Sequence, residues 1–155
     1  MKKTNAARIL DRMKIGYELI EYKVDDEDLS AVHLAKAAGI PIRQVYKTLV
    51  LEGDKNGYFV CIVQGDDEID LKKAAIVSGN KKVAMIKMKE LEPLTGYIRG
   101  GCSPLGMKKS FPVFIDESAF KQDLIYVSAG VRGMQIRLSP LDLMIACHAK
   151  RGEIT

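Results

Sequence analysis

The chain has 155 residues, of which 47% are hydrophobic and 28% charged, and its formal net charge is +4. This size and balance are typical of one globular domain with its own core, so we expect a single domain over residues 1–155. No apolar run is long enough to cross a membrane and no apolar leader core follows the basic start, so we expect a cytoplasmic protein without membrane contact. The mild basic excess permits contact with nucleic acid but does not demand it.

The three cysteines are Cys61, Cys102 and Cys147, and their spacing is wide and irregular. Without a CxxC pair, neither a zinc knuckle nor a dithiol redox motif is indicated. In a reducing compartment such residues are free thiols. We therefore expect no metal and no cofactor.

Capping and turn residues divide the first half of the chain into helices and strands. Thr4 and Ser30 are typical caps of two helices that end before Gly16 and Gly39. The Asp54–Gly57 segment contains Asn-Gly, the strongest hairpin signal. The apolar segments between these signals predict strands at residues 17–24, 45–51 and 58–64.

The second half of the chain shows the same kind of signals. Asp70 caps a helix that ends at Gly79, a short helix precedes or includes Pro93, and Ser139 caps a final helix that starts at Pro140. We expect strands at residues 82–86, 112–116, 124–128 and 134–138. Strands outnumber helices and several neighbours form hairpins. The sequence therefore predicts an α/β chain of the α+β type with a mixed, largely antiparallel sheet, and it excludes a Rossmann arrangement.

Lys47 is a charged residue in the middle of a strand whose two faces are otherwise largely apolar. On its own face it has Val45 and Leu49 as neighbours. A lysine in such a place must reach solvent, pair, or lie in a pocket. Two interpretations stay open with equal weight: a pocket cation that binds an anion, or an edge-strand lysine that prevents aggregation.

The segment 96–106 is unusual because it holds four glycines and one proline in eleven residues. Adjacent glycines let backbone N–H groups converge on a carbonyl oxygen or a phosphate. The alternative is a plain surface turn, which is the usual meaning of a Gly-rich loop. The segment is neither a P-loop nor a G-x-G-x-x-G motif, so nucleotide motifs do not apply.

Other candidates carry less weight. The spacing of the histidines, His33 and His148, relative to other residues does not indicate a general base. We therefore expect both to be ordinary surface residues. Cys102 lacks a recognisable histidine partner, which disfavours a nucleophilic role. The acidic run 25–28 lacks EF-hand spacing and is typical of a solvated loop. The chain has four lysine pairs, at residues 2–3, 72–73, 81–82 and 108–109. Such pairs are usually solvated, and they form a phosphate-binding surface only if they converge in space.

Four segments, in this order, resemble the YbaK/EbsC family, and most closely its Cys-tRNA(Pro) deacylase branch. They are VYKTLV at 45–50, DLKKAA at 70–75, GYIRGGCSPLG at 96–106 and YVSAGVRG at 126–133. The resemblance covers nearly the whole chain. The family is related to the editing domain of bacterial prolyl-tRNA synthetases, and its fold is a mixed sheet curled toward a barrel with helices around it.

The resemblance also implies roles for individual residues. Lys47 matches the family's essential lysine and is expected to be catalytic. At position 102 this chain has a cysteine where the family often has an aliphatic residue, which would alter the preferred amino acid if the side chain faces the pocket. The expected substrate-binding residues are Tyr22, Thr48, Gly100, Gly101, Cys102, Ser103, Pro104, Gly106, Ser128, Ala129, Gly130 and Asp142.

The activity that the resemblance implies is hydrolysis of the ester between a wrong amino acid and its tRNA, with Cys-tRNA(Pro) as the expected substrate. Cleavage is expected by direct ester hydrolysis or with assistance from the substrate's own thiol. Expected partners are the 3′ acceptor end of aminoacyl-tRNA and, transiently, prolyl-tRNA synthetase. Three alternatives stay open: a deacylase for another small amino acid such as Ala-tRNA(Pro), a non-catalytic module that binds tRNA ends, and an enzyme for another phosphate ligand.

Overall fold

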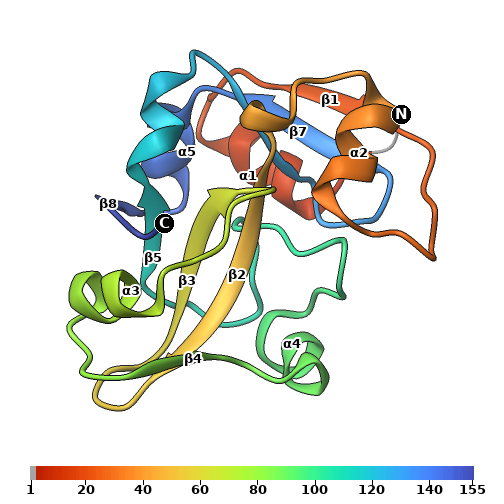
Figure 1. Ribbon diagram of the computed structural model, residues 1–155. Helices are drawn as coiled ribbons and strands as arrows, with labels where there is room; N and C mark the ends of the chain where they lie inside the picture. Colours follow the sequence, from red (N-terminus) through yellow and green to blue (C-terminus); the bar gives the residue numbers. More distant parts are fainter. Residues whose placement is uncertain (1–2) are drawn as a thin grey trace.

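The computed structural model describes residues 3–155, which form two sheets and five α-helices (Figure 1). The smaller sheet is antiparallel, in the order β1 (Glu18–Glu21), β7 (Met134–Leu138) and β6 (Ile125–Ser128). The larger sheet has the order β4 (Val83–Met85), β2 (Tyr46–Gly53), β3 (Gly57–Gln64), β5 (Val113–Asp116) and β8 (Lys150–Gly152).

The larger sheet is mixed, since β4, β2 and β3 pair antiparallel while β5 and β8 are added in parallel. An isolated parallel bridge between Val45 and Tyr126 connects the two sheets beside the start of β2. The predicted fold class, mixed and largely antiparallel with surrounding helices, is therefore confirmed. The strands in residues 3–155 form two open sheets and no closed barrel.

The helices begin and end where the capping residues predict. Thr4, Ser30, Asp70 and Ser139 each accept a backbone N–H at the start of a helix. Gly39, Gly79 and Gly96 end their helices in the left-handed conformation that glycine adopts without penalty. The helices are α1 (Asn5–Arg12), α2 (Ala31–Ala38), α3 (Leu71–Ser78), α4 (Met88–Thr95) and α5 (Pro140–Ala146), with 3-10 turns at Ile42–Gln44 and Glu117–Lys121.

Strand β2 has a separate apolar cluster on each of its faces. Tyr46 and Val50 pack into the main core between the two sheets, with residues of α1, β6, β7 and α5. Leu51 packs on the opposite face, where α3 and the buried Ile154 complete a second cluster. Two-sided packing fixes the register of β2, because a shift of one residue would exchange the two faces.

One predicted strand differs from the structure, and one strand was not predicted. The first strand covers only Glu18–Glu21 instead of 17–24, because its partner β7 begins at Met134, opposite Glu21. The last residues are ordered, since β8 pairs with β5 and Ile154 is fully buried. The sequence did not indicate β8, because a three-residue edge strand with two exposed basic residues shows no apolar alternation.

Candidate active site

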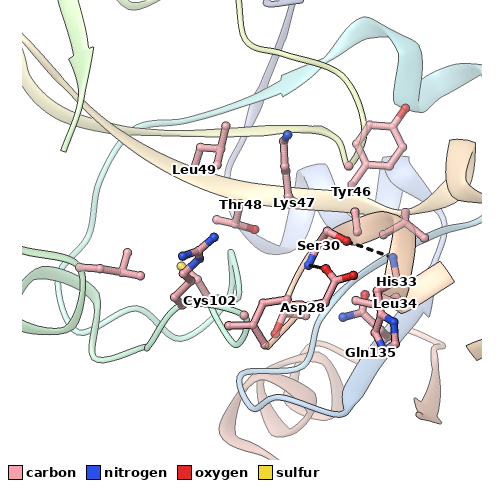
Figure 2. Close-up of a pocket in the computed structure, with 18 of the residues that line it drawn as sticks. Asp28, Ser30, His33, Leu34, Tyr46, Lys47, Thr48, Leu49, Cys102 and Gln135 are labelled. Carbon is pink, nitrogen blue, oxygen red and sulfur yellow. Dashed lines mark hydrogen bonds between the residues drawn. The ribbon is translucent and has the colours of Figure 1, made fainter. Parts of the chain in front are cut away.

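A cavity of about 420 Å³ lies on one face of β2, between the two sheets and the helices α2 and α4. This volume is typical of small-ligand sites. The lining comes from residues 22–34, which lead into and include most of α2, from residues 45–50 at the start of β2 with Gly65 beside them, from the region between β4 and the glycine-rich loop, and from the facing ends of β6 and β7. Figure 2 shows the arrangement, with Thr48, Cys102, Gln135 and His33 gathered on the same side of β2.

Three side-chain atoms in residues 3–155 are buried without a hydrogen-bond partner, and all three belong to residues that line this cavity. They are Nε2 of His33, Oγ1 of Thr48 and Oε1 of Gln135. A buried polar atom without a partner costs about 1–3 kcal/mol, and nearly all such atoms in folded proteins are paired. Their convergence from α2, β2 and β7 indicates a site that a polar ligand completes.

Two of these three residues were missed by sequence reasoning. His33 was predicted to be an ordinary surface residue, and this prediction is wrong because α2 packs over the cavity and buries its ring nitrogen. Gln135 is 3% exposed, on the central strand of the smaller sheet. A single histidine in a short helix and a glutamine between apolar neighbours give no signal that distinguishes them from surface residues. His148 is exposed, as predicted.

Lys47 lies at the border of the cavity, and its ammonium group is held by backbone. Its Nζ donates a hydrogen bond of 2.8 Å to the carbonyl oxygen of Asp67, in the turn after β3. Figure 2 shows Lys47 and Thr48 on opposite sides of β2, with Thr48 on the side of Cys102. The strand β4 pairs only with residues from Leu51 onward, so near Lys47 the strand β2 is at the edge of its sheet. Both interpretations of this lysine thus correspond to a real feature, since it is partly buried beside a cavity and also near a sheet edge.

The first part of the glycine-rich loop lines the cavity. Gly100 has a φ of 82°, in the left-handed region, and with Cys102 it contributes to the wall. The N–H of Gly101 donates to the carbonyl of Ile98, whereas the N–H groups of Gly100 and Cys102 have no partner within residues 3–155. Amides without a partner in the cavity wall are available to a carbonyl oxygen of a ligand.

Gly101 itself has a packing role. A Cβ at this position would lie 3.3 Å from backbone atoms of Val131 and Arg132 in the turn between β6 and β7. The side chain of Arg132 fastens the same contact, because its Nε donates to the carbonyl of Arg99 at 2.8 Å. The loop and the turn are thus held together, which explains why two motifs far apart in sequence both reach the cavity.

The second part of the loop anchors it to the core instead of the cavity. Ser103 is fully buried and its Oγ accepts the N–H of Leu105, while Pro104 is buried beside it. The hydroxyl of Tyr97 donates to the carbonyl of Leu105, and a Cβ on Gly106 would meet this same hydroxyl. Ser103, Pro104 and Gly106 therefore do not line the cavity.

The thiol of Cys102 faces the cavity beside Thr48 (Figure 2). Burial raises the pKa of this thiol to about 12, because a thiolate there would lose its hydration. The group is consequently neutral at physiological pH and is a poor nucleophile. What such a thiol offers to a ligand is its size and polarisability.

The remaining predicted residues fall into two groups. Tyr22 and Ser128 line the cavity, and the Oγ of Ser128 accepts the N–H of Gly130 to shape the adjoining turn. Ala129 is fully buried, and Gly130 packs against Tyr97. Asp142 lies in the first turn of α5, away from the residues that line the cavity.

Charged residues border the cavity on two sides. Asp25 and Asp28 line it from the segment ahead of α2, and Arg99 lines it from the glycine-rich loop. The Oγ–H of Ser30 beside Asp28 lowers the pKa of that carboxyl group, so it is ionised at neutral pH. Within residues 3–155 no group of three or more His, Cys, Asp or Glu side chains has the geometry of a metal site. No helix in the described part of the chain is long and apolar enough to span a bilayer.

Comparisons with known proteins identify the family to which this chain belongs. The model of the aminoacyl-tRNA editing domain matches residues 27–145. A relative from Enterococcus faecalis, named as the proposed Cys-tRNA(Pro)/Cys-tRNA(Cys) deacylase EbsC, is 47% identical over 99% of this chain and 94% of its own length. A proline–tRNA ligase from Fervidobacterium nodosum is 30% identical over 51% of this chain and 14% of its own length.

A solved structure described as a proposed trans-editing enzyme for prolyl-tRNA synthetase superposes with a TM-score of 0.83 at 24% identity, over 99% of each chain. At this identity the likeness shows the common fold. The family match and the relative of nearly equal length go further, because they include the segments that build the cavity. The chain belongs to the aminoacyl-tRNA editing domain family.

Proposed function

We propose that this protein is a hydrolase that removes a wrongly attached amino acid from tRNA, with Cys-tRNA(Pro) as its main substrate. The observation that carries the proposal is the cavity with three partnerless polar atoms, in a member of the editing family. The name of the relative EbsC supports cysteine as the amino acid, and it adds Cys-tRNA(Cys) as a second substrate. Because aminoacyl-tRNA is used in the cytoplasm, we place the activity there.

An aminoacyl ester is already reactive, so the protein has to position it and stabilise the oxyanion. The free N–H groups of Gly100 and Cys102 would bind the carbonyl oxygen. His33, Thr48 and Gln135 would complete their hydrogen bonds with the α-amino group, the thiol or the terminal ribose. A substrate that satisfies all three is favoured, because one that lacks a partner group leaves a buried atom unpaired.

For cysteine, cleavage can use the thiol of the substrate itself. The thiol sulfur attacks the ester carbonyl carbon, the bond to the tRNA oxygen breaks, and the thiol proton ends on that oxygen. Water then opens the cyclic thioester to free cysteine. This route needs no nucleophile from the enzyme, which agrees with a protonated Cys102. Lys47, whose ammonium group is bonded to the carbonyl of Asp67 on the side of β2 away from Cys102, would hold a phosphate or the ester oxygen of the acceptor end.

Recruitment by prolyl-tRNA synthetase completes the proposal. A net charge of +4 is modest for a protein that binds a whole tRNA by itself. We therefore expect weak binding of tRNA alone and a transient complex at the synthetase. A tight complex between this protein and free tRNA would contradict this part.

The test is a panel of Cys-, Ala-, Ser- and Pro-charged tRNA(Pro) incubated with the purified protein. Cys-tRNA(Pro) is expected to be hydrolysed fastest, and Lys47→Ala is expected to lose at least about a hundredfold in kcat/KM while keeping its fold. Lys55→Ala, an exposed lysine in the β2–β3 turn, is the control and should keep full activity. Equal cleavage of Ser- and Cys-tRNA would rule out thiol assistance, and normal rates for Lys47→Ala would remove this residue from the mechanism.

A further inference from the structure

The basic charge of the protein is concentrated in one segment. Residues 81–109 hold seven basic and two acidic residues, a net charge of +5, whereas the whole chain has +4. The rest of the chain therefore has a net charge of −1. All seven side chains are exposed: Lys81, Lys82, Lys87, Lys89, Arg99, Lys108 and Lys109.

None of these seven side chains takes part in an ion pair within residues 3–155. The ion pairs there use other basic residues, namely Lys3, Lys73, Arg132, Arg137 and Arg151. Exposed cations without a partner in the protein remain available to an external anion. We call these seven residues the β4–α4 basic surface.

The β4–α4 basic surface is close to the mouth of the cavity. Met85, Met88 and Arg99, from the same segment, line the cavity, and Lys87 and Lys89 are adjacent to Met88 in sequence. In Figure 1, β4 leads into α4 at the bottom of the view. The N–H of Lys108 donates to the carbonyl of Thr95, which brings the last two lysines back to the end of α4.

Another part of the cavity wall is acidic. Residues 25–28 are all acidic and exposed, and two of them, Asp25 and Asp28, line the cavity. Only Asp26 of this run takes part in an ion pair within the described residues, with Arg132. The cavity wall thus carries both cationic and anionic groups, and Arg132 lies between them, since it donates to Asp26 and to the carbonyl of Arg99. Such a charge distribution orients a charged partner.

We propose that the β4–α4 basic surface binds the sugar–phosphate backbone of the tRNA acceptor end and that the RNA enters the cavity over this surface. This inference rests on the proposed function for the chemistry in the cavity. Each lysine that contacts a phosphate releases condensed counterions, which favours binding at low salt. The 25–28 run repels the same backbone, which directs the RNA toward the lysines. Met85 and Met88 are 45% and 59% exposed, and they offer apolar contact to the unpaired bases of the acceptor end.

The experiment compares two double variants of equal charge. Lys87→Gln/Lys89→Gln removes two cations from the surface, and Lys121→Gln/Lys150→Gln removes two exposed cations near β8, at the other edge of the larger sheet. For Cys-tRNA(Pro), the first pair is expected to raise KM about tenfold at low salt and to lower the slope of log KM against log salt by about 2. Its kcat stays unchanged, and the second pair has no effect on either.

The cysteinyl ester of adenosine is the second substrate, because it has no phosphate. Both double variants are expected to hydrolyse it like the native protein. Equal KM values of the two double variants for tRNA would overturn the inference and leave an acidic protein surface as the partner of these lysines. If the native protein cleaves neither ester, the proposed function fails; the surface is then judged by binding of a labelled acceptor-stem hairpin. Weaker binding of the hairpin by Lys87→Gln/Lys89→Gln alone supports the proposed role of the β4–α4 basic surface. Equal binding by both double variants overturns this role.

Discussion

Thr48 shows how a single residue can favour binding at the expense of stability. Its hydroxyl is buried without a partner on the cavity side of β2, whereas Thr95 is buried with its hydroxyl donating to the carbonyl of Leu91 at 2.7 Å. The two threonines differ in whether the protein itself supplies a hydrogen-bond partner for the hydroxyl group. An unsatisfied hydroxyl is expected where a ligand supplies the missing hydrogen bond.

Replacement of each threonine by the isosteric valine tests this difference. Thr48→Val is expected to raise the free energy of unfolding by about 1 kcal/mol, because the desolvated hydroxyl disappears, and to lower kcat/KM about tenfold. Thr95→Val is expected to lower the free energy of unfolding by about 1 kcal/mol, because it removes the hydrogen bond to the carbonyl of Leu91. Urea unfolding measures both, and destabilisation of the same size in the two variants would contradict the assignment of Thr48 to a ligand.

Cys102 gives a prediction about pH. Burial raises the pKa of its thiol from 9.0 to about 12, so the thiolate fraction at pH 8 is about one in ten thousand instead of about one in ten. Iodoacetamide, which reacts with thiolates, is therefore expected to label Cys102 very slowly at pH 8 and about tenfold faster with each pH unit up to 11. Mass spectrometry of the labelled peptide measures the rate, with the unfolded protein as reference. Labelling at the reference rate would show that the thiol is not shielded.

At the scale of elements, the glycine-rich loop and the β6–β7 turn depend on each other. Gly101→Ala places a Cβ 3.3 Å from turn backbone, which is held in place and cannot easily move. We expect a loss of about 1–2 kcal/mol in stability and a marked fall in kcat/KM, because the wall of the cavity shifts. Gly16→Ala is the control, since no atom lies within 4 Å of its added Cβ. Its stability is expected to change little or to rise. Calorimetry measures the stability of the two variants, and deacylation rates give their kcat/KM. An unchanged stability of Gly101→Ala would show that the loop does not need a glycine at this position for packing.

The secondary structure was largely predictable because its signals are local. Caps such as Thr4 and Asp70 and the Asn-Gly turn at 56–57 act on neighbours a few residues away, so they can be recognised in the sequence. The cavity was only partly predictable. Thr48 and Cys102 were found through the resemblance to a family, whereas Gln135 is buried by packing between distant elements. No pattern along one strand records which polar side chain a distant helix covers.

At the scale of the whole molecule, the C-terminal residues stabilise the larger sheet. Ile154 is fully buried, and its N–H donates to the carboxylate of Asp116 at 2.9 Å. Ile154→Ala is expected to lower the free energy of unfolding by about 2–5 kcal/mol. Ile145→Ala, at a residue that is 57% exposed, is expected to change it by less than about 0.5 kcal/mol. Thermal unfolding measures both. KM at low temperature should stay constant, because neither residue lines the cavity, and an altered KM would mean that the end of the chain shapes the site.

The pairing of β1 with β7 has a consequence for synthesis on the ribosome. Glu18 faces Arg137 in this pair, so β1 is made long before its partner. At about 5–20 residues per second, translation from one to the other takes roughly 6 to 24 seconds. Gln135, a wall residue of the cavity, belongs to the late strand. A nascent chain therefore cannot complete the cavity until β7 has been made.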